Sequence, residues 1–328
     1  MIAYTITLNN KRKKYNPTPK PTIFPEEVNL MLDDIPEEEF LYKGNTACAG
    51  CSAMLALRYI LKAAGPNTII VNPACCSTVC QGTFPKSAYG VPVLNIAFAA
   101  AAAAADGIAS AARNKGKNVV VFAGDGGTVD IGIQSLSGAI ERNANILYVC
   151  YDNEAYSNTG MQKSGSTPYG AITTTTPTGR QDSKKDIDLI IMAHRPKYMA
   201  SASAAYPKDL YAKVQKALSI EGTKFIHVQC PCPPGWRYST EKSVELGKLA
   251  VKCGMWFLFE YEDGKLTLNA PTKAALKRPA PLEDYVRPQG RFKGVNLERL
   301  QKEVDEGMGR IRDMANLDAL EKAKEATQ

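Results

Sequence analysis

The sequence is poor in histidine and has no long apolar run. Its only two histidines are His194 and His227, and we expect both to be core or surface residues rather than metal ligands. The longest apolar run, residues 96–105, has ten residues and is mostly alanine, whereas a helix that crosses a bilayer needs about 20. These shortages argue against a histidine-based metal site and against a membrane-spanning protein.

The sequence also lacks the signals of secretion and of nucleic-acid binding. Its N-terminal segment has a basic cluster, Lys11–Lys14, but no apolar core followed by a small-residue cleavage site. The net charge of +7 is spread along the chain, without the basic stripe and interleaved aromatic residues that nucleic-acid binding needs. We therefore expect a cytoplasmic protein that binds neither nucleic acid nor membranes, with the basic cluster in a solvated tail.

Cysteine, in contrast, is abundant and clustered. The nine cysteines are Cys48, Cys51, Cys75, Cys76, Cys80, Cys150, Cys230, Cys232 and Cys253. An odd number in a reducing compartment argues against a framework of disulfides. Metal or redox chemistry explains them better.

Strand-like and helix-like segments alternate through the middle of the chain. Short apolar runs bounded by turn residues predict buried strands, and longer segments with apolar residues at helical spacing predict helices. The expected strands lie near 67–72, 118–123, 146–153, 198–203 and 224–230, and the expected helices near 46–64, 95–113, 130–142, 186–194 and 207–219. This alternation predicts an α/β fold with a doubly wound, mainly parallel sheet covered on both faces.

Composition divides the chain into three segments. Residues 1–40 are rich in Pro, Lys and Glu and predict an extended N-terminal arm. Residues 41–270 predict the α/β domain, which closes with a hairpin turning at Asp263-Gly264. Residues 271–328 predict a charged, mostly helical C-terminal tail.

Two loops rich in glycine and oxygen ligands follow two of the predicted strands. The first is Gly124-Asp125-Gly126-Gly127, and the second begins at Asn153. Ligands of an open parallel sheet bind beyond the carboxyl ends of its strands. Glycines let the backbone approach a phosphate closely, while carboxylate and amide oxygens suit a magnesium ion. The GDG motif alone is common in turns, but these two loops together predict a diphosphate site with its metal.

Four cysteines form a second constellation. Cys48 and Cys51 make a C-x-x-C pair at the start of a predicted helix, where backbone N–H groups favour thiolates. Cys76 and Cys232 each follow a predicted strand. Four thiolates from separate loops suit either a four-iron, four-sulfur cluster or a structural zinc ion. Spacing alone leaves both possibilities open.

Five segments, in chain order, resemble the β subunit of pyruvate:ferredoxin oxidoreductase and its relatives in the 2-oxoacid:ferredoxin oxidoreductase family. They are CAGC (48–51), CCST (75–78), GDGG (124–127), DNEAYSNTGMQKSGSTPYGA (152–171) and PCPPGW (231–236). The 26 residues between GDG and Asn153 also match the pattern of thiamine-diphosphate enzymes. The resemblance covers about residues 41–262 and implies a thiamine-diphosphate-binding domain.

The resemblance also implies roles for individual residues. Asp125 and Asn153 would be side-chain ligands of the Mg²⁺ ion on the cofactor diphosphate, with the Ala155 carbonyl as a third ligand. Asn158, in SNTG, would reach the reacting centre and hydrogen-bond the substrate. The cysteines implied to bind one four-iron, four-sulfur cluster are Cys48, Cys51, Cys76 and Cys232, with Cys75, Cys80 and Cys230 as packing neighbours.

The activity that the resemblance implies is oxidative decarboxylation of a 2-oxoacid to acyl-CoA and CO₂, with electrons passing through the cluster to ferredoxin. An α subunit would supply the glutamate that activates the cofactor. The complex would also contain γ and ferredoxin-like δ subunits. Pyruvate is favoured because residues 166–179 resemble the pyruvate enzymes most, and oxalate, phenylglyoxylate and branched-chain oxoacids are alternatives. A non-redox thiamine lyase, which has no use for four cysteines, and a zinc-stabilised scaffold subunit are the rival interpretations.

Overall fold

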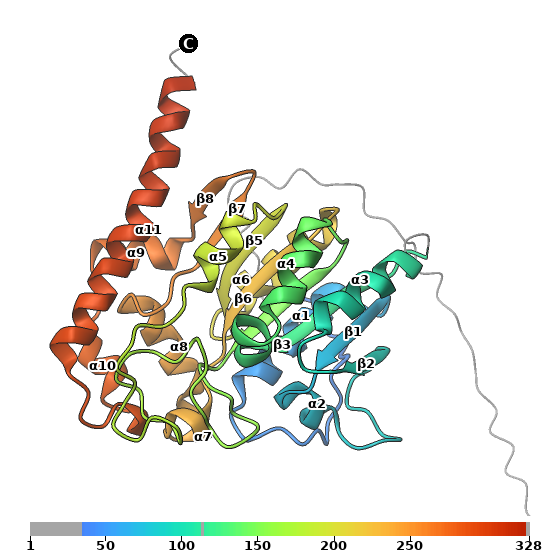
Figure 1. Cartoon of the computed structure of the whole chain (residues 1–328), viewed down its shortest axis with the longest axis horizontal. Helices are drawn as coiled ribbons and strands as arrows, with labels where there is room; N and C mark the ends of the chain where they lie inside the picture. Colours follow the sequence, from blue (N-terminus) through green and yellow to red (C-terminus); the bar gives the residue numbers. More distant parts are fainter. Residues whose placement is uncertain (1–34, 113–114, 326–328) are drawn as a thin grey trace, which may run out of the picture. The chain divides into compact units, whose positions relative to one another are not determined.

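A single sheet organises the computed structural model, which describes residues 35–112 and 115–325 (Figure 1). The strand order is β2-β1-β3-β4-β6-β5-β7-β8. Every pair from β2 to β5 is parallel, whereas β7 and β8 are antiparallel additions at one edge. The strands are β1 (Thr68–Pro73), β2 (Val93–Ile96), β3 (Asn118–Gly124), β4 (Leu147–Asp152), β5 (Tyr198–Ser203), β6 (Lys224–Gln229), β7 (Phe259–Glu262) and β8 (Lys265–Leu268). The predicted mainly parallel sheet is confirmed.

Helices cover both faces of this sheet. Alternate residues of β3 point to opposite sides, since Val120 and Phe122 belong to one buried cluster while Val119 and Val121 belong to another. The first cluster includes α1 (Ser52–Ala64) and α6 (Pro207–Ser219), and the second includes α3 (Ala101–Ala112), α4 (Ile133–Glu141) and α5 (Ile187–Ala193). The apolar side of each of these helices thus faces the sheet. This is the doubly wound arrangement that the sequence predicts.

The remaining helices lie around the ends of the strands and along the C-terminal segment. They are α2 (Cys76–Gln81), α7 (Pro233–Trp236), α8 (Ser243–Lys252), α9 (Ala270–Lys277), α10 (Leu282–Val286) and α11 (Leu297–Glu325). A third buried cluster joins α8, α10 and the first part of α11 through residues such as Tyr285, Leu300 and Val304. The expected helical C-terminal segment is present, and its first half packs onto the domain.

Several predicted boundaries were wrong for local reasons. The first helix begins at Ser52 rather than near residue 46, because Gly50 has a left-handed φ of 71° that ends any helix before it. The helix expected from residue 95 begins at Ala101, since β2 occupies Val93–Ile96 as an edge strand. The hairpin at Asp263-Gly264 is confirmed, and both residues have positive φ.

A π-helical turn, Gly126–Asp130, separates β3 from α4. The Ile131 amide donates to the Gly126 carbonyl over 3.2 Å, which makes this turn one residue wider than an α-helical turn. The helix predicted from residue 130 therefore begins only at Ile133.

Most of the predicted N-terminal arm, including Lys11–Lys14, lies outside the described residues. At residues 36–38 the chain is fixed by Lys62, whose Nζ donates to three successive backbone carbonyls. In the part of the chain that is described, no helix is both long and apolar enough to cross a bilayer.

Candidate functional site

Four neighbouring parallel strands bring the predicted site residues to one edge of the sheet. In the order β1-β3-β4-β6, the carboxyl ends lead into the loops of Cys76, Asp125, Asn153 and Cys232. Because all four strands run in the same direction, these loops leave the same end of the sheet. The C-x-x-C pair joins them from the turn before α1, with Cys51 at the N-cap position.

The three groups predicted to bind Mg²⁺ lie between the loops that follow β3 and β4. Asp125 is 1% exposed, and its Oδ2 has no hydrogen-bond partner in the described structure. The amide atom of Asn153 that faces it lies 3.1 Å from Asp125 Oδ1 and 2.8 Å from the Ala155 carbonyl oxygen. With nitrogen in this position, Asn153 donates hydrogen bonds to both groups. With oxygen there, three oxygen atoms meet, an arrangement that a cation would stabilise.

The electrostatics of this region depend on a second carboxylate behind the first. Burial, and then the negative charge of Asp152, raise the pKa of Asp125 well above its usual range. Burial opposes the ionised form of Asp152 as well, but the hydrogen bond and charge of His227 outweigh it and lower the pKa of Asp152. A divalent cation at Asp125 would favour the carboxylate form that burial disfavours. The donor set thus fits a magnesium ion.

Glycine is required in the loop after β3 because aromatic rings press against it. A Cβ on Gly126 would lie 2.4 Å from a ring carbon of Tyr156. The Tyr156 hydroxyl donates to Asp130 Oδ2 over 3.0 Å, and the Gly165 amide donates to the same oxygen over 2.8 Å. These contacts tie the loop after β3 to the long loop after β4.

The four predicted cluster ligands surround the neighbouring part of this edge. Cys48 is exposed, and Cys51, Cys76 and Cys232 are half-buried. Burial raises the pKa of Cys76, and the charges of Cys232, Cys75, Cys80 and Cys51 raise it further. Burial raises the pKa of Cys232 to about 11, to which Cys51 and Cys48 also contribute. The four thiols are therefore electrostatic neighbours. Within residues 35–112 and 115–325, no group of three or more His, Cys, Asp or Glu side chains is arranged to hold a single metal ion.

Asn158 lies at the tip of the loop after β4. Its side chain is exposed and makes no hydrogen bond to the described residues, whereas the preceding Ser157 is buried and bonds to Asn153 Oδ1 over 2.8 Å. Asn158 is therefore free to contact a molecule bound at this edge.

Known proteins match this chain over most of its length. The family model for the C-terminal TPP-binding domain of thiamine pyrophosphate enzymes matches residues 49–228. Pyruvate synthase subunit PorB of Methanothermobacter marburgensis is 48% identical, over 83% of this chain and 96% of that protein. Ketoisovalerate oxidoreductase subunit VorB of Pyrococcus horikoshii is 47% identical, over 89% and 98%. The chain belongs to the β-subunit family of the 2-oxoacid:ferredoxin oxidoreductases.

As a 2-oxoacid:ferredoxin oxidoreductase β subunit, the chain is part of a thiamine-diphosphate enzyme. The relatives of the chain are named as subunits, which implies partner chains. Its fold is similar to a chain of the 2-oxoglutarate:ferredoxin oxidoreductase of Magnetococcus marinus, with a TM-score of 0.53 at 21% identity over 67% of this chain and 81% of that chain. The predicted family and thiamine-diphosphate-binding fold are confirmed. The individual ligand assignments remain predictions.

Sequence reasoning missed the residues that support the site from behind. His227, expected to be an ordinary core or surface residue, is buried between Asp152 (2.9 Å) and Asp188 (2.8 Å). Glu154 and Arg291 form a buried ion pair next to Asn153. The tryptophan of PCPPGW could have indicated part of this supporting structure. Nothing in the sequence around Arg291 indicates that this arginine takes part.

Proposed function

We propose that this β subunit binds thiamine diphosphate through Mg²⁺, carries one four-iron, four-sulfur cluster, and acts with partner subunits in the oxidative decarboxylation of a 2-oxoacid. The products are acyl-CoA and CO₂, and the electrons pass to ferredoxin. The observation that supports this most is the buried carboxyl group of Asp125, whose Oδ2 has no hydrogen-bond partner in the described structure and whose Oδ1 lies 3.1 Å from the Asn153 amide. A carboxylate so far from water is costly unless a positive charge accompanies it.

In this proposal each loop has a separate task. Asp125 and Asn153 hold the cation with their side chains, Ala155 holds it with its carbonyl, and Gly124, Gly126 and Gly127 give the diphosphate access to the backbone. When bound, thiamine diphosphate supplies a nucleophilic carbon and an electron sink. The exposed amide of Asn158 orients the oxoacid by donating a hydrogen bond to one of its oxygens.

Cys48, Cys51, Cys76 and Cys232 are the proposed cluster ligands. In a four-iron, four-sulfur cluster each thiolate binds a different iron, so that the sulfur atoms surround a larger group than a zinc ion. This is compatible with thiols that affect one another's pKa without converging on one point. Metal analysis of the assembled complex tests the assignment. Iron and sulfide with a reducible paramagnetic signal support it, whereas zinc supports a scaffold subunit and no metal supports a non-redox lyase.

Pyruvate is the first candidate substrate. A branched-chain oxoacid is the second, because relatives named as ketoisovalerate oxidoreductase subunits are as similar as those named as pyruvate synthase subunits. The test is a screen of oxoacids with the purified complex of α, β, γ and δ subunits, coenzyme A and a viologen dye. We expect dye reduction that depends on coenzyme A and is fastest with pyruvate. If none of the oxoacids supports dye reduction, the proposal is contradicted.

A further inference from the structure

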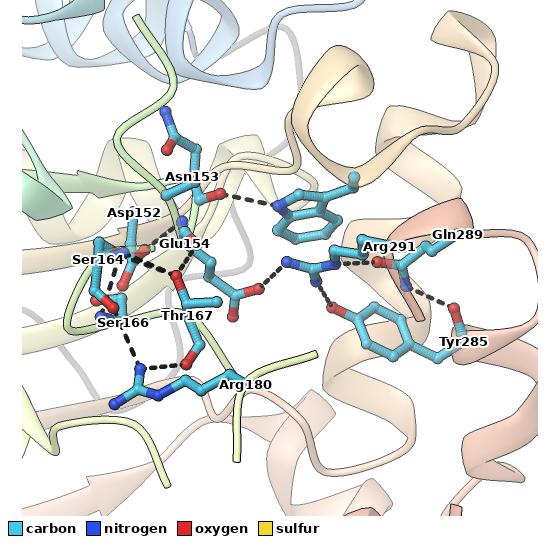
Figure 2. Close-up of polar contacts among 12 residues, drawn as sticks. Asp152, Asn153, Glu154, Ser164, Ser166, Thr167, Arg180, Tyr285, Gln289 and Arg291 are labelled. Carbon is cyan, nitrogen blue, oxygen red and sulfur yellow. Dashed lines mark hydrogen bonds and ion pairs between the residues drawn. The ribbon is translucent and has the colours of Figure 1, made fainter. Parts of the chain in front are cut away.

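A buried ion pair lies directly behind the proposed cation ligands. Arg291 Nη1 is 2.6 Å from Glu154 Oε2, and the two side chains are 3% and 1% exposed (Figure 2). Glu154 stands between Asn153 and Ala155, while Arg291 comes from the short helical turn Gly290–Phe292 after α10. Two full charges removed from water in this way stabilise a protein only when their geometry is well satisfied. The pair therefore indicates a constraint on the segment 153–155.

Both backbone polar groups of Glu154 are hydrogen-bonded, and its buried Oε2 has Arg291 as an ion-pair partner but no hydrogen bond in the described structure. Glu154 has a left-handed φ of 61°, which is costly for a residue with a branched or long side chain. Its backbone N–H donates to Asp152 Oδ1 over 2.7 Å, and its carbonyl accepts from Thr167 Oγ1 over 2.7 Å. The ion pair with Arg291 fixes the side chain. Because the strained backbone sets the directions of the Asn153 side chain and the Ala155 carbonyl, what anchors Glu154 also aims the proposed cation ligands.

The same arginine is connected to the cysteine loop through Trp236. The Arg291 guanidinium carbon lies 3.7 Å from the centre of the Trp236 ring, close enough for a cation–π contact. Trp236 Nε1 donates to the Asn153 carbonyl over 2.8 Å, and the Trp236 backbone N–H donates to the Cys232 carbonyl over 2.8 Å. One ring thus links Arg291 to both proposed ligand sets.

Arg291 is itself fixed within the C-terminal segment. Its Nε donates to Gln289 Oε1 over 2.9 Å and its Nη2 to the Tyr285 hydroxyl over 3.1 Å (Figure 2). Its backbone carbonyl accepts from the Ile172 amide over 2.7 Å. A planar guanidinium can pair with Glu154, hydrogen-bond to Gln289 and Tyr285 and stack on an indole at the same time, whereas a lysine ammonium cannot stack in this way.

We propose that Arg291 is a positioning residue that holds the Asn153–Ala155 segment and the Cys232–Trp236 turn in one relative geometry. The inference rests on the proposed function, because it concerns the residues proposed to bind the cation and the cluster. It assigns the segment around Arg291, which lies far from the family motifs in sequence, to the alignment of the two cofactor sites. Loss of the guanidinium, or of the Glu154 carboxylate that pairs with it, should disturb both sites together, whereas loss of a single proposed ligand should disturb one.

The test uses the assembled complex with Arg291→Met, Arg291→Lys or Glu154→Gln in this chain. Arg287→Met is the matched control, since Arg287 is an exposed arginine of the same segment. Three quantities are measured: the affinity for Mn²⁺ with thiamine diphosphate, the paramagnetic spectrum of the reduced cluster, and the unfolding temperature. We expect Arg291→Met and Glu154→Gln to weaken Mn²⁺-dependent cofactor binding by about tenfold or more and to change the cluster spectrum. Arg291→Lys should restore part of the affinity but not the spectrum, and Arg287→Met should change none of the three.

The outcomes separate this inference from the proposed function. Variants that unfold at a lower temperature but keep wild-type Mn²⁺ and cofactor affinity and an unchanged spectrum would show a merely structural role and overturn the inference. If Arg291→Met does not assemble, Arg291→Lys and Glu154→Gln decide by the same criteria. A wild-type complex that binds no Mn²⁺ with thiamine diphosphate, or contains no cluster, would instead refute the proposed function.

Discussion

The two proposed ligand sets differ in construction although they follow neighbouring strands. Asp125 and Asn153 are buried, and the loops around them are tied together by side-chain contacts such as those of Asp130 and Thr167. The cysteines range from half-buried to exposed, and they come from three separate turns, with Cys48 and Cys51 in the same one. We therefore expect the proposed oxygen site to be preformed by the fold, and the proposed cysteine site to depend more on a bound group.

The two proposed ligand sets also differ in how protonation affects them. Burial raises the pKa of Cys51, Cys76 and Cys232, so these thiols are protonated at neutral pH unless a metal displaces the protons. Burial also disfavours the carboxylate form of Asp125, but the loops around it are joined by hydrogen bonds within the chain. Removing a ligand should therefore have different consequences in the two regions.

The largest effect is expected for Cys76→Ser, because a hydroxyl is a poor ligand for iron. The complex should lose the cluster signal and reduce viologen only at background rate, while thiamine diphosphate still binds. Cys75→Ser is the matched control, since the Cys75 thiol contacts the Pro73 carbonyl (2.9 Å) and Ser77 Oγ (3.0 Å) instead. Iron and sulfide contents and the paramagnetic spectrum measure the outcome. Equal losses in both variants would contradict the assignment.

Asp125→Asn should separate binding from stability. We expect Mn²⁺-dependent binding of thiamine diphosphate to weaken by more than about a hundredfold. The cofactor-free protein should unfold at a higher temperature, because the change replaces a buried carboxylate, whose ionised form burial disfavours, with a neutral amide. Calorimetry measures both quantities.

The control for this change is Asp106→Asn. Asp106 forms a surface ion pair with Arg142 over 2.8 Å, which contributes less than about 1 kcal/mol. A lower unfolding temperature for Asp125→Asn than for Asp106→Asn would show that the oxygen site is not strained without its cation.

Asn158→Ala should act on turnover alone. The side chain is exposed and makes no hydrogen bond to the described residues, so that neither stability nor cofactor affinity should change. The kcat for the oxoacid should fall by about a hundredfold, as expected for loss of one oriented hydrogen-bond donor. Steady-state kinetics of the complex with saturating cofactor test this. A change in thiamine-diphosphate affinity with unchanged kcat would assign Asn158 to cofactor binding instead.

The smallest effect concerns the support behind the oxygen site. Burial alone would lower the pKa of His227, but Asp188 and Asp152 outweigh it and raise this pKa to about 10. The unfolded pKa is about 6.5, so the protonated imidazole contributes stability that is fully present below pH about 6.5 and is lost as pH rises through about 10. His227→Gln should therefore cost most stability at neutral or lower pH and little above pH 10. Unfolding temperatures of the two proteins that differ by the same amount at every pH would refute this.

The sequence was sufficient for the parts of the fold that follow simple periodicity. Strands β3, β4, β5 and β6 and helices α5 and α6 lie close to the predicted ranges, because buried apolar runs and helical spacing are local properties. The edge strand β2 and the short helix α2 were not predicted, since each has only a few residues and is stabilised by contacts with neighbouring elements.

The candidate site was predictable only where residues follow strands in recognisable motifs. Asp125, Asn153 and the four cysteines are marked by motifs. Parallel pairing brings the loops of Asp125, Asn153, Cys76 and Cys232 to one edge, but it does not place the turn of Cys48 and Cys51. The pairing of Glu154 with Arg291 depends on how the C-terminal segment packs, which no local pattern encodes. The support of a site is therefore harder to predict than its ligands.

The wide turn after Asp125 has a consequence for how this loop can vary. Its additional residue places Asp130 where one carboxylate meets Tyr156, Gly165 and Lys185. Shortening the turn by one residue would restore regular helical geometry and rotate Asp130 by about 100°, away from all three. We therefore expect related proteins to keep the same number of residues in the segment that corresponds to 126–132, even where the side chains differ.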